Sequence, residues 1–253
     1  MTLTATALSK RYGAATALAL DALTVGAGER VALVGNNGAG KTTLLRLALD
    51  LIAPTAGRVE LDGVRVGGPD ESWKGRVGAF LDAGFLVDYL RPQEYFRFVA
   101  GSYGVSAPEA DARLARFEGF LTGAMDGALI RDLSLGNAAK VGIVGAMLPE
   151  PDLILLDEPF ANLDPGARIA LEGLITREAS GEGRASGRGA TVLVSSHDLE
   201  HVVGIASRVL VLAGGRLVRD TPATPGTLGE LRAFFAGGGG APDAGTAPGA
   251  AAV

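Results

Sequence analysis

A nine-residue segment, GNNGAGKTT (35–43), combines glycines, one lysine and two threonines in a spacing that suits phosphate binding. It fits the pattern G-x-x-x-x-G-K-[ST]. The glycines let successive backbone N–H groups face phosphate oxygens, the lysine can reach the β- and γ-phosphates, and the first threonine hydroxyl can ligate Mg²⁺. We predict a nucleotide-binding loop made of Gly35, Asn36, Asn37, Gly38, Ala39, Gly40, Lys41, Thr42 and Thr43.

A second segment, LILLDEP (153–159), places two carboxylates after an apolar run. Asp157 can hold Mg²⁺ through its water shell, and Glu158 can orient or deprotonate an attacking water. Two acids after a strand are usually only the start of a loop. Beside a phosphate-binding loop, the catalytic interpretation becomes the stronger one.

Strand-like and helix-like segments alternate along the chain, which predicts an α/β fold with a covered sheet. Buried strands are expected at 30–35, 152–158 and 189–197, a half-exposed strand at 57–66, and two strands around a Gly-Gly turn at 208–220. Helices are expected at 41–51 and over most of 85–148. The segment 176–190 predicts a helix end followed by a mobile surface loop.

The order of these motifs resembles the nucleotide-binding domain of an ABC transporter over residues 2–235. The segments that carry the resemblance, besides the two above, are LSLGN (133–137), FANLD (160–164), SSH (195–197) and KRYG (10–13). The resemblance implies a P-loop NTPase core with a mainly parallel sheet, an N-terminal antiparallel β subdomain and a helical subdomain at about 85–148. The Gly/Ala/Pro-rich tail, 236–253, is expected to be disordered.

The resemblance also implies a head-to-tail dimer, homodimeric or heterodimeric, that encloses two ATP molecules with Mg²⁺. Ser134 and Gly136 would hold the γ-phosphate of the ATP bound to the partner subunit, although Ser134 can equally be a helix cap. Asp164 would lie in the loop that joins the half-sites, and Tyr12 would stack on adenine. Lys41, Glu158 and the switch histidine His197 would be catalytic.

Three positions depart from the pattern of that family. Leu135 stands where the family most often has glycine, and a leucine at this position resembles one group of bacterial ABC exporters. Asn137 stands where the family has glutamine. Asp82 matches the position of a glutamine that touches Mg²⁺. We predict that Asp82 keeps the metal role, the alternative being a carboxylate that faces solvent.

The segment HDLEH (197–201) also fits H-x-x-E-H, the signature of an inverted zinc protease. Two histidines one helical turn apart can share a metal ion. The chain has no cysteine and no third histidine, so only carboxylates would complete the site. We prefer the switch role for His197 and a plain helix position for His201.

Residues 80–103 contain seven of the fourteen aromatic residues: Phe80, Phe85, Tyr89, Tyr95, Phe96, Phe98 and Tyr103. Most are expected in the core of a helical subdomain. The resemblance implies a second use, a groove that receives a short helix of a membrane partner.

Bulk properties agree with a peripheral protein. No charge-free apolar stretch approaches the ~18–20 residues that a spanning helix needs, and the net charge of −5 disfavours broad nucleic-acid binding. We expect a cytoplasmic ATPase on the inner face of the membrane that drives transport through a separate permease. We expect the direction of transport to be export rather than import. The alternatives are an ABC ATPase outside transport and a nucleotide-gated module with little turnover.

Overall fold

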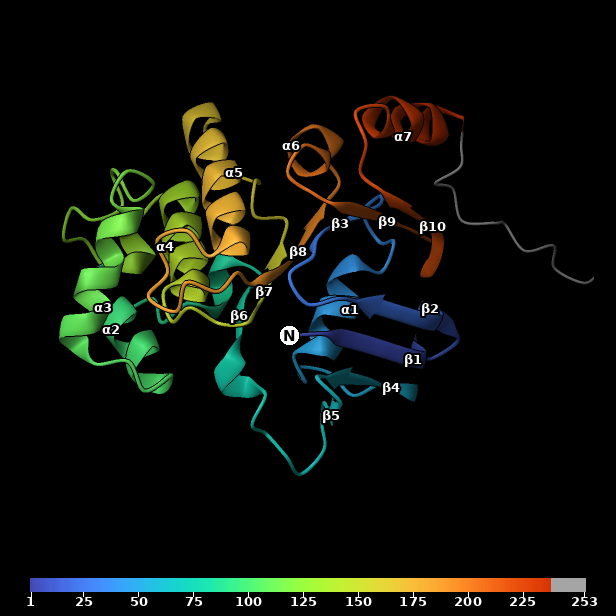
Figure 1. Cartoon of the computed structure of the whole chain (residues 1–253), viewed down its shortest axis with the longest axis horizontal. Coiled ribbons are helices and arrows are strands. Elements are labelled where there is room, and N and C mark those ends of the chain that lie inside the picture. The colour runs from blue at the N-terminus through green and yellow to red at the C-terminus, as the bar shows by residue number, and fades with distance from the viewer. Residues whose placement is uncertain (238–253) are drawn as a thin grey trace, which may run out of the picture.

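The computed structural model describes residues 1–237 of the chain as an α/β protein with two sheets (Figure 1). The larger sheet has the strand order β10-β9-β3-β8-β7-β6. Its strands are β3 (Arg30–Val34), β6 (Val77–Phe80), β7 (Leu153–Asp157), β8 (Thr191–Ser196), β9 (Arg208–Ala213) and β10 (Arg216–Pro222). All neighbours are parallel except β9 and β10, which form the expected hairpin. The predicted fold class is confirmed.

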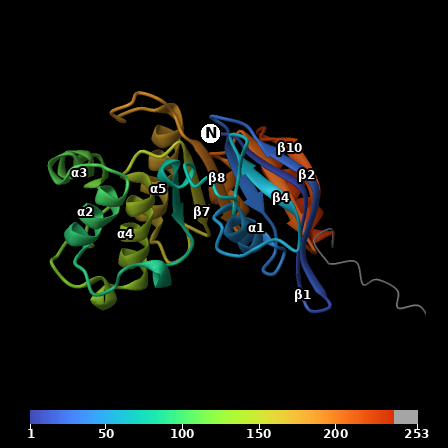
Figure 2. The same cartoon turned by 90° about the horizontal axis from the view of Figure 1, so that it is seen from below.

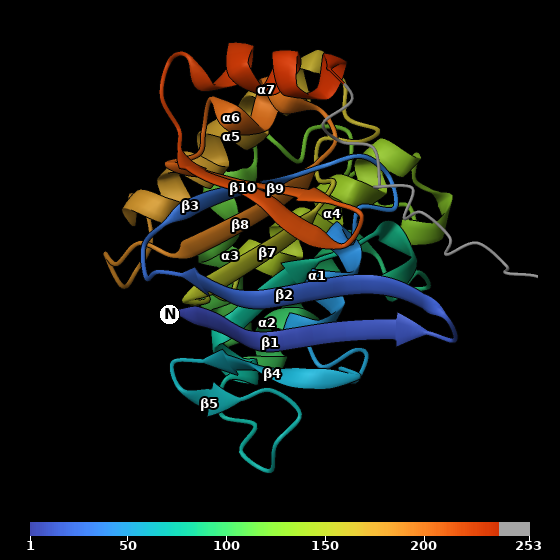
Figure 3. The same ribbon diagram turned by 90° about the vertical axis from the view of Figure 1, so that its right-hand side faces the viewer.

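The smaller sheet is antiparallel, with the order β2-β1-β4-β5 (Figure 3). Its strands are β1 (Leu3–Tyr12), β2 (Ala15–Val25), β4 (Ala56–Leu61) and β5 (Val64–Arg65). The single strand expected at 57–66 is therefore wrong. Asp62 and Gly63 both have positive φ, which is the geometry of a tight hairpin turn, so the chain reverses there.

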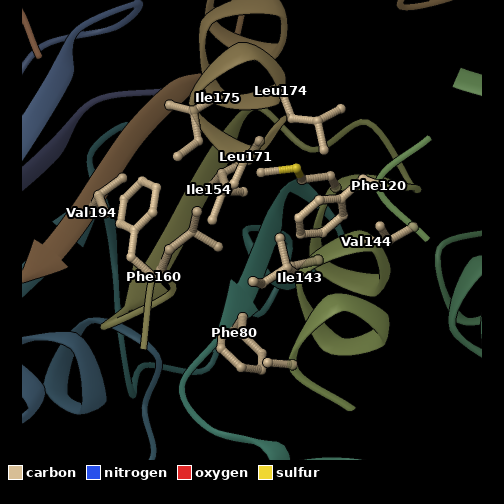
Figure 4. Close-up of a cluster of buried hydrophobic side chains, with 14 of the residues drawn as sticks. Phe80, Phe120, Ile143, Val144, Ile154, Phe160, Leu171, Leu174, Ile175 and Val194 are labelled. Atoms are coloured by element: carbon tan, nitrogen blue, oxygen red, sulfur yellow. The ribbon is translucent and has the colours of Figure 1, made fainter. Parts of the chain in front are cut away.

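Both faces of the larger sheet are covered, which explains its continuous apolar strands. Along β3 and β7, Val31 and Leu153 face one core, which contains α1 (Lys41–Ala48) and the antiparallel sheet. Ala32 and Ile154 face the other core, which lies beneath α4 (Leu135–Met147) and α5 (Pro165–Ser180) (Figure 4). Period-two alternation thus assigns neighbouring residues to opposite cores.

Helices α2 (Pro92–Ser102) and α3 (Ala107–Leu114) lie on the opposite side of the molecule from β1 and β2 (Figure 2). Of the aromatic residues in this part, Phe80 and Phe96 are buried, and burial raises the pKa of Tyr95 to about 12. Phe85, Tyr89 and Phe98 are exposed.

Among residues 1–237, no helix combines the length and apolar character that crossing a membrane requires.

Glycines let α4 lie unusually close to its neighbours. A Cβ atom added to Gly142 would lie 2.6 Å from the ring of Phe80, and one added to Gly145 would lie 2.8 Å from the ring of Tyr95. Both distances are shorter than real Cβ contacts. Side chains of β6 and α2 therefore fill the space that larger residues on α4 would need.

A buried charge cluster joins the chain after α3 to α5 and the following loop. Its members are Arg116, Glu150, Glu178 and Arg184. Arg116 pairs with Glu178 at 2.9 Å and with Glu150 at 3.2 Å, and Arg184 donates to the carbonyl oxygen of Pro151 at 2.6 Å. Burial raises the pKa of Glu178 and lowers that of Arg116.

The loop after α5 is consequently more structured than its composition predicts. The backbone N–H groups of Ala185 and Ser186 donate to the carboxylate of Glu150. The last elements are α6 (Leu199–Val203) and α7 (Thr227–Ala236). Most of the tail predicted to be disordered, 238–253, lies outside the described residues.

Candidate nucleotide-binding site

The phosphate loop connects β3 to α1, as expected. Gly38 and Gly40 have φ values of 80° and 104°, a left-handed region that favours glycine. A Cβ atom added to Gly40 would lie 2.8 Å from the carbonyl oxygen of Ala17, so β2 presses against the loop. The loop borders a cleft of about 330 Å³ lined by Ala17, Asn37, Gly38, Ala39, Gly40, Lys41, Thr42, Thr43 and Glu158.

Lys41, the first residue of α1, is buried. Its Nζ donates to the carbonyl oxygens of Gly35 at 2.7 Å and Asn36 at 3.3 Å. The same atom lies 3.2 Å from Oε1 of Glu158. The ammonium group is thus held at the cleft by the backbone behind it and by one carboxylate in front.

Thr42 and Asp157 meet at the ends of neighbouring elements. The Thr42 hydroxyl donates to Oδ2 of Asp157 at 2.5 Å, and the Ser195 hydroxyl donates to Oδ1 of the same carboxylate. The sequence motifs did not identify Ser195 as a site residue. The signal was present, because SSH ends strand β8 and the ends of neighbouring parallel strands share one edge of a sheet.

These groups fit Mg²⁺. The ion prefers oxygen ligands and is usually held by one or two carboxylates together with substrate phosphates and water. Thr42 and Asp157 supply oxygen donors of this kind beside the phosphate loop. Within residues 1–237, no group of three or more histidine and carboxylate side chains is arranged to hold a metal ion.

Glu158 and His197 form a pair. Nδ1 of His197 lies 2.9 Å from Oε2 of Glu158, and the backbone N–H of His197 donates to the same oxygen at 3.2 Å. Glu158 has a φ of 47°, rare for a residue with a side chain, and its own N–H donates to Ser195 Oγ at 3.0 Å. The unusual backbone aims the carboxylate at the cleft.

The two histidines contact different carboxylates, which removes the support for a zinc site. His197 contacts Glu158, whereas Nδ1 of His201 lies 2.8 Å from Oε1 of Glu172 on α5. In the described part of the chain, no third ligand joins them.

The segment LSLGN begins α4. Ser134 is its N-cap, with Oγ accepting from the N–H of Asn137 at 3.3 Å. Leu135 is 69% exposed. Gly136 lies against the loop after β7, since an added Cβ would lie 2.5 Å from the carbonyl oxygen of Asn162. Neither Ser134 nor Gly136 lines the cleft of the phosphate loop in the same subunit.

Asp164, Tyr12 and Asp82 also lie outside the cleft lining. Asp164 caps α5, and the N–H of Ala167 lowers its pKa. Tyr12 is 55% exposed at the end of β1, with Lys10 Nζ 5.0 Å from the centre of its ring. Asp82 is exposed, and its Oδ1 accepts from the N–H of Gly84 at 2.7 Å.

A phosphate loop between a strand and a helix, met by acids and a histidine from two neighbouring parallel strands, defines a P-loop nucleotide-binding protein. The family model that matches is the ABC transporter, over residues 20–161. This is more than half of the chain, so the chain belongs to the ABC transporter family.

Known proteins support this assignment. An uncharacterised ABC transporter ATP-binding protein of Nostoc sp. is 34% identical over 83% of this chain and 59% of the relative. A phosphonates import ATP-binding protein of Anaeromyxobacter dehalogenans is 32% identical over 98% of this chain and 51% of the relative. The chain therefore spans between half and three fifths of these two relatives. The solved structure of an ATP-binding subunit of an ABC transporter is 31% identical, covers 93% of this chain and 94% of its own, and has a TM-score of 0.76.

Proposed function

We propose that this chain binds and hydrolyses ATP as the nucleotide-binding subunit of an ABC transporter. One observation carries the proposal. The ends of β3, β7 and β8 bring together Lys41, Thr42 and Glu158, which line one cleft, and Asp157 and His197, which contact Thr42 and Glu158. Groups that bind phosphate, ligate a metal ion and accept a proton are together there, in a chain of the ABC transporter family.

Each residue has a role that follows from its contacts. Lys41 and the backbone N–H groups of residues 37–43 bind the phosphates. Thr42 and Asp157 would hold Mg²⁺, which neutralises charge on the phosphate oxygens when it is bound. Glu158 takes the proton of the attacking water, and His197 orients its carboxylate through Oε2.

The second subunit completes the site. Ser134 and Gly136 begin a helix of 13 residues whose N-terminal N–H groups can bind an anion, and they lie outside the cleft in their own subunit. We propose that they contact the γ-phosphate of ATP bound to the partner, and that Asp164 lies at the same junction. Tyr12 is exposed enough to stack on adenine at the edge of β1.

A separate permease would hold the subunit at the inner face of the membrane. A hollow of about 500 Å³ lies beside the start of α4, with Ala83, Leu86, Leu133 and Leu135 in its lining. Phe85 and Tyr89, both exposed, lie in the same part of the chain. Exposed aromatic residues beside a hollow suit the docking of a partner helix.

The relatives bear on the direction of transport. Several relatives with a named cargo are import ATP-binding proteins, for phosphonates, zinc, aliphatic sulfonates and Fe(3+) ions. The expectation of export rests on Leu135 alone and finds no support among them. We propose transport-coupled hydrolysis and assign no cargo.

The experiment is an ATPase assay of the purified chain with a Lys41→Ala control, followed by copurification from native membranes. Phosphate release that the control lacks, together with recovery of a membrane-spanning protein, is the expected result. ATP binding without release above the control would favour the nucleotide-gated module. Hydrolysis without any membrane partner would favour an ABC ATPase outside transport.

Asp82 provides a separate prediction. We propose that its carboxylate contributes to Mg²⁺ binding, so hydrolysis by the wild type should depend more steeply on Mg²⁺ than hydrolysis by Asp82→Asn. Asparagine keeps a side-chain oxygen that can accept from Gly84, so the substitution removes charge and spares the turn. Titration of ATPase activity with Mg²⁺ is the measurement. If the Mg²⁺ titration curves of the wild type and Asp82→Asn coincide, Asp82 has only the structural role of a turn residue.

A further inference from the structure

His201 lies at the junction of three segments that the proposed mechanism uses separately. It belongs to α6, which begins two residues after His197. Its ring stacks on Phe160, two residues after Glu158, with centroids 5.5 Å apart and planes 22° apart. Its Nδ1 contacts Glu172 on α5. We infer that His201 is a positioning residue that holds the Glu158 loop and the His197 segment in register.

The stacking contact joins the histidine to the core. Phe160 is buried in the same cluster as Ile154, Leu171 and Val194 (Figure 4). The chain between Glu158 and Phe160 is short, and the N–H of Ala161 donates to the carbonyl oxygen of Glu158 at 3.0 Å. A ring that lies flat on Phe160 therefore limits how far α6 can shift relative to Glu158.

The polar contacts define the tautomer of His201. Nε2 lies 3.3 Å from Nη1 of Arg168, which can only donate, so Nε2 must accept. Nδ1 then carries the proton and donates to Oε1 of Glu172 at 2.8 Å. Asp198 is the other charged group that faces the ring, with Oδ2 3.9 Å from Nε2. The ring thus bridges a cation and an anion.

Arg168 extends the connection to the loop that, in the proposed function, lies opposite the second subunit. Its Nε donates to the carbonyl oxygen of Leu163 at 3.0 Å, and the next residue, Asp164, caps α5. Leu163 follows Asn162, whose carbonyl oxygen lies against Gly136. His201 is therefore in contact, through one arginine, with the loop between Glu158 and the start of α5.

This inference rests on the proposed function, because the geometry that His201 maintains is the contact between Glu158 and His197. Loss of the polar bridge should let this pair separate and lower kcat. The KM for ATP should change little, since Lys41 keeps the carbonyl oxygens of Gly35 and Asn36 as acceptors even if its contact with Glu158 is lost. A change confined to kcat distinguishes positioning from general loss of structure.

Three variants separate the alternatives. His201→Leu keeps an apolar side chain over Phe160 and removes both polar contacts. His201→Gln can accept from Arg168 and donate to Glu172, so it restores the bridge. Glu200→Gln is the matched control on the same helix, because it removes the ion pair with Arg232 and leaves His201 untouched.

We expect His201→Leu to lower kcat about tenfold with KM for ATP within about twofold, as displacement of a catalytic group by a fraction of an ångström does. His201→Gln should recover most of the loss, and Glu200→Gln should resemble the wild type. Wild-type kcat in His201→Leu would overturn the inference. So would a parallel fall in kcat and thermal stability that glutamine does not rescue.

A measurement without activity tests the same contact. The chain has two histidines, so a long-range ¹H–¹⁵N spectrum contains two imidazole patterns. We expect His201 as the Nδ1–H tautomer, and we expect the His197 signals to move in His201→Leu but not in His201→Gln. Unmoved His197 signals would overturn the inference even if the chain does not hydrolyse ATP, and an inactive wild type would refute only the proposed function.

Discussion

Glu158→Gln is expected to lower ATP hydrolysis by about 10²–10³-fold while ATP stays bound, because an amide keeps the shape of the carboxylate but cannot accept the proton of water. Lys41 loses one ionic contact and keeps its two backbone acceptors, so the phosphate loop should retain its geometry. ATP should then persist, and the closed dimer should accumulate. Phosphate release and light scattering with ATP are the measurements.

The same variant tests the role of Ser134. Ser134→Arg in the Glu158→Gln background places a bulky cation where the second subunit would approach, and should keep the protein monomeric with ATP bound. Ser106→Arg is the matched control, since Ser106 also caps a helix with its side chain and precedes α3. The control should still dimerise. If the Ser134 variant closes as readily, Ser134 is only a helix cap.

The partner subunit bears on the interpretation of this test. If the natural partner is a different chain, the homodimer will not form in either background, and the measurement is repeated with the copurified complex. Closure of the complex with Ser134→Arg would then contradict the shared site.

Arg116→Met is expected to lower the free energy of unfolding by about 3–5 kcal/mol, because removal of one partner leaves buried charge uncompensated. Glu178 and Glu150 both face this guanidinium, and the side chains of both carboxylates are almost fully buried. Methionine preserves most of the side-chain volume. The loss in the free energy of unfolding therefore measures the removal of the charge rather than the creation of a cavity. Urea unfolding followed by circular dichroism is the measurement.

Arg97→Met is the control for Arg116→Met. Arg97 also pairs with a carboxylate, Asp111 at 2.7 Å, but both side chains are exposed. Exposed pairs contribute about 0–1 kcal/mol, so this variant should unfold close to the wild type. Equal losses in the free energy of unfolding for the two variants would mean that the buried charge cluster stabilises the fold no more than a surface ion pair does.

Much of the nucleotide-binding part could be predicted because its determinants are local. The phosphate loop needs glycines and a lysine at fixed spacing between a strand and a helix, and residues 35–43 supply them. Apolar runs identified β3, β7 and β8 because strands buried on both faces lack polar alternation. The hairpin at Gly214 and Gly215 carries its own turn signal.

What could not be predicted depends on contacts between distant segments. The composition of the loop after α5 is typical of a mobile loop. Hydrogen bonds from Arg184 to Pro151 and from Ala185 to Glu150 nevertheless hold it, and the partners are about 30 residues apart in sequence. The contacts of His201 could not be predicted for the same reason, since Phe160 and Glu172 become its neighbours only in the folded chain. Asp62 and Gly63 did carry a turn signal, but the alternation of 57–66 concealed it.

The close packing of α4 has a consequence for anyone who builds chimaeras of this protein. The rings of Phe80, on β6, and Tyr95, on α2, occupy the space that side chains at Gly142 and Gly145 would need. A helix transplanted from a relative with alanine at either position would collide with those rings, whatever the merit of its own LSLGN-like start. The transferable unit is therefore a block of α4 with β6 and α2, and a successful exchange of the helix alone would require smaller residues at 80 and 95 in the recipient.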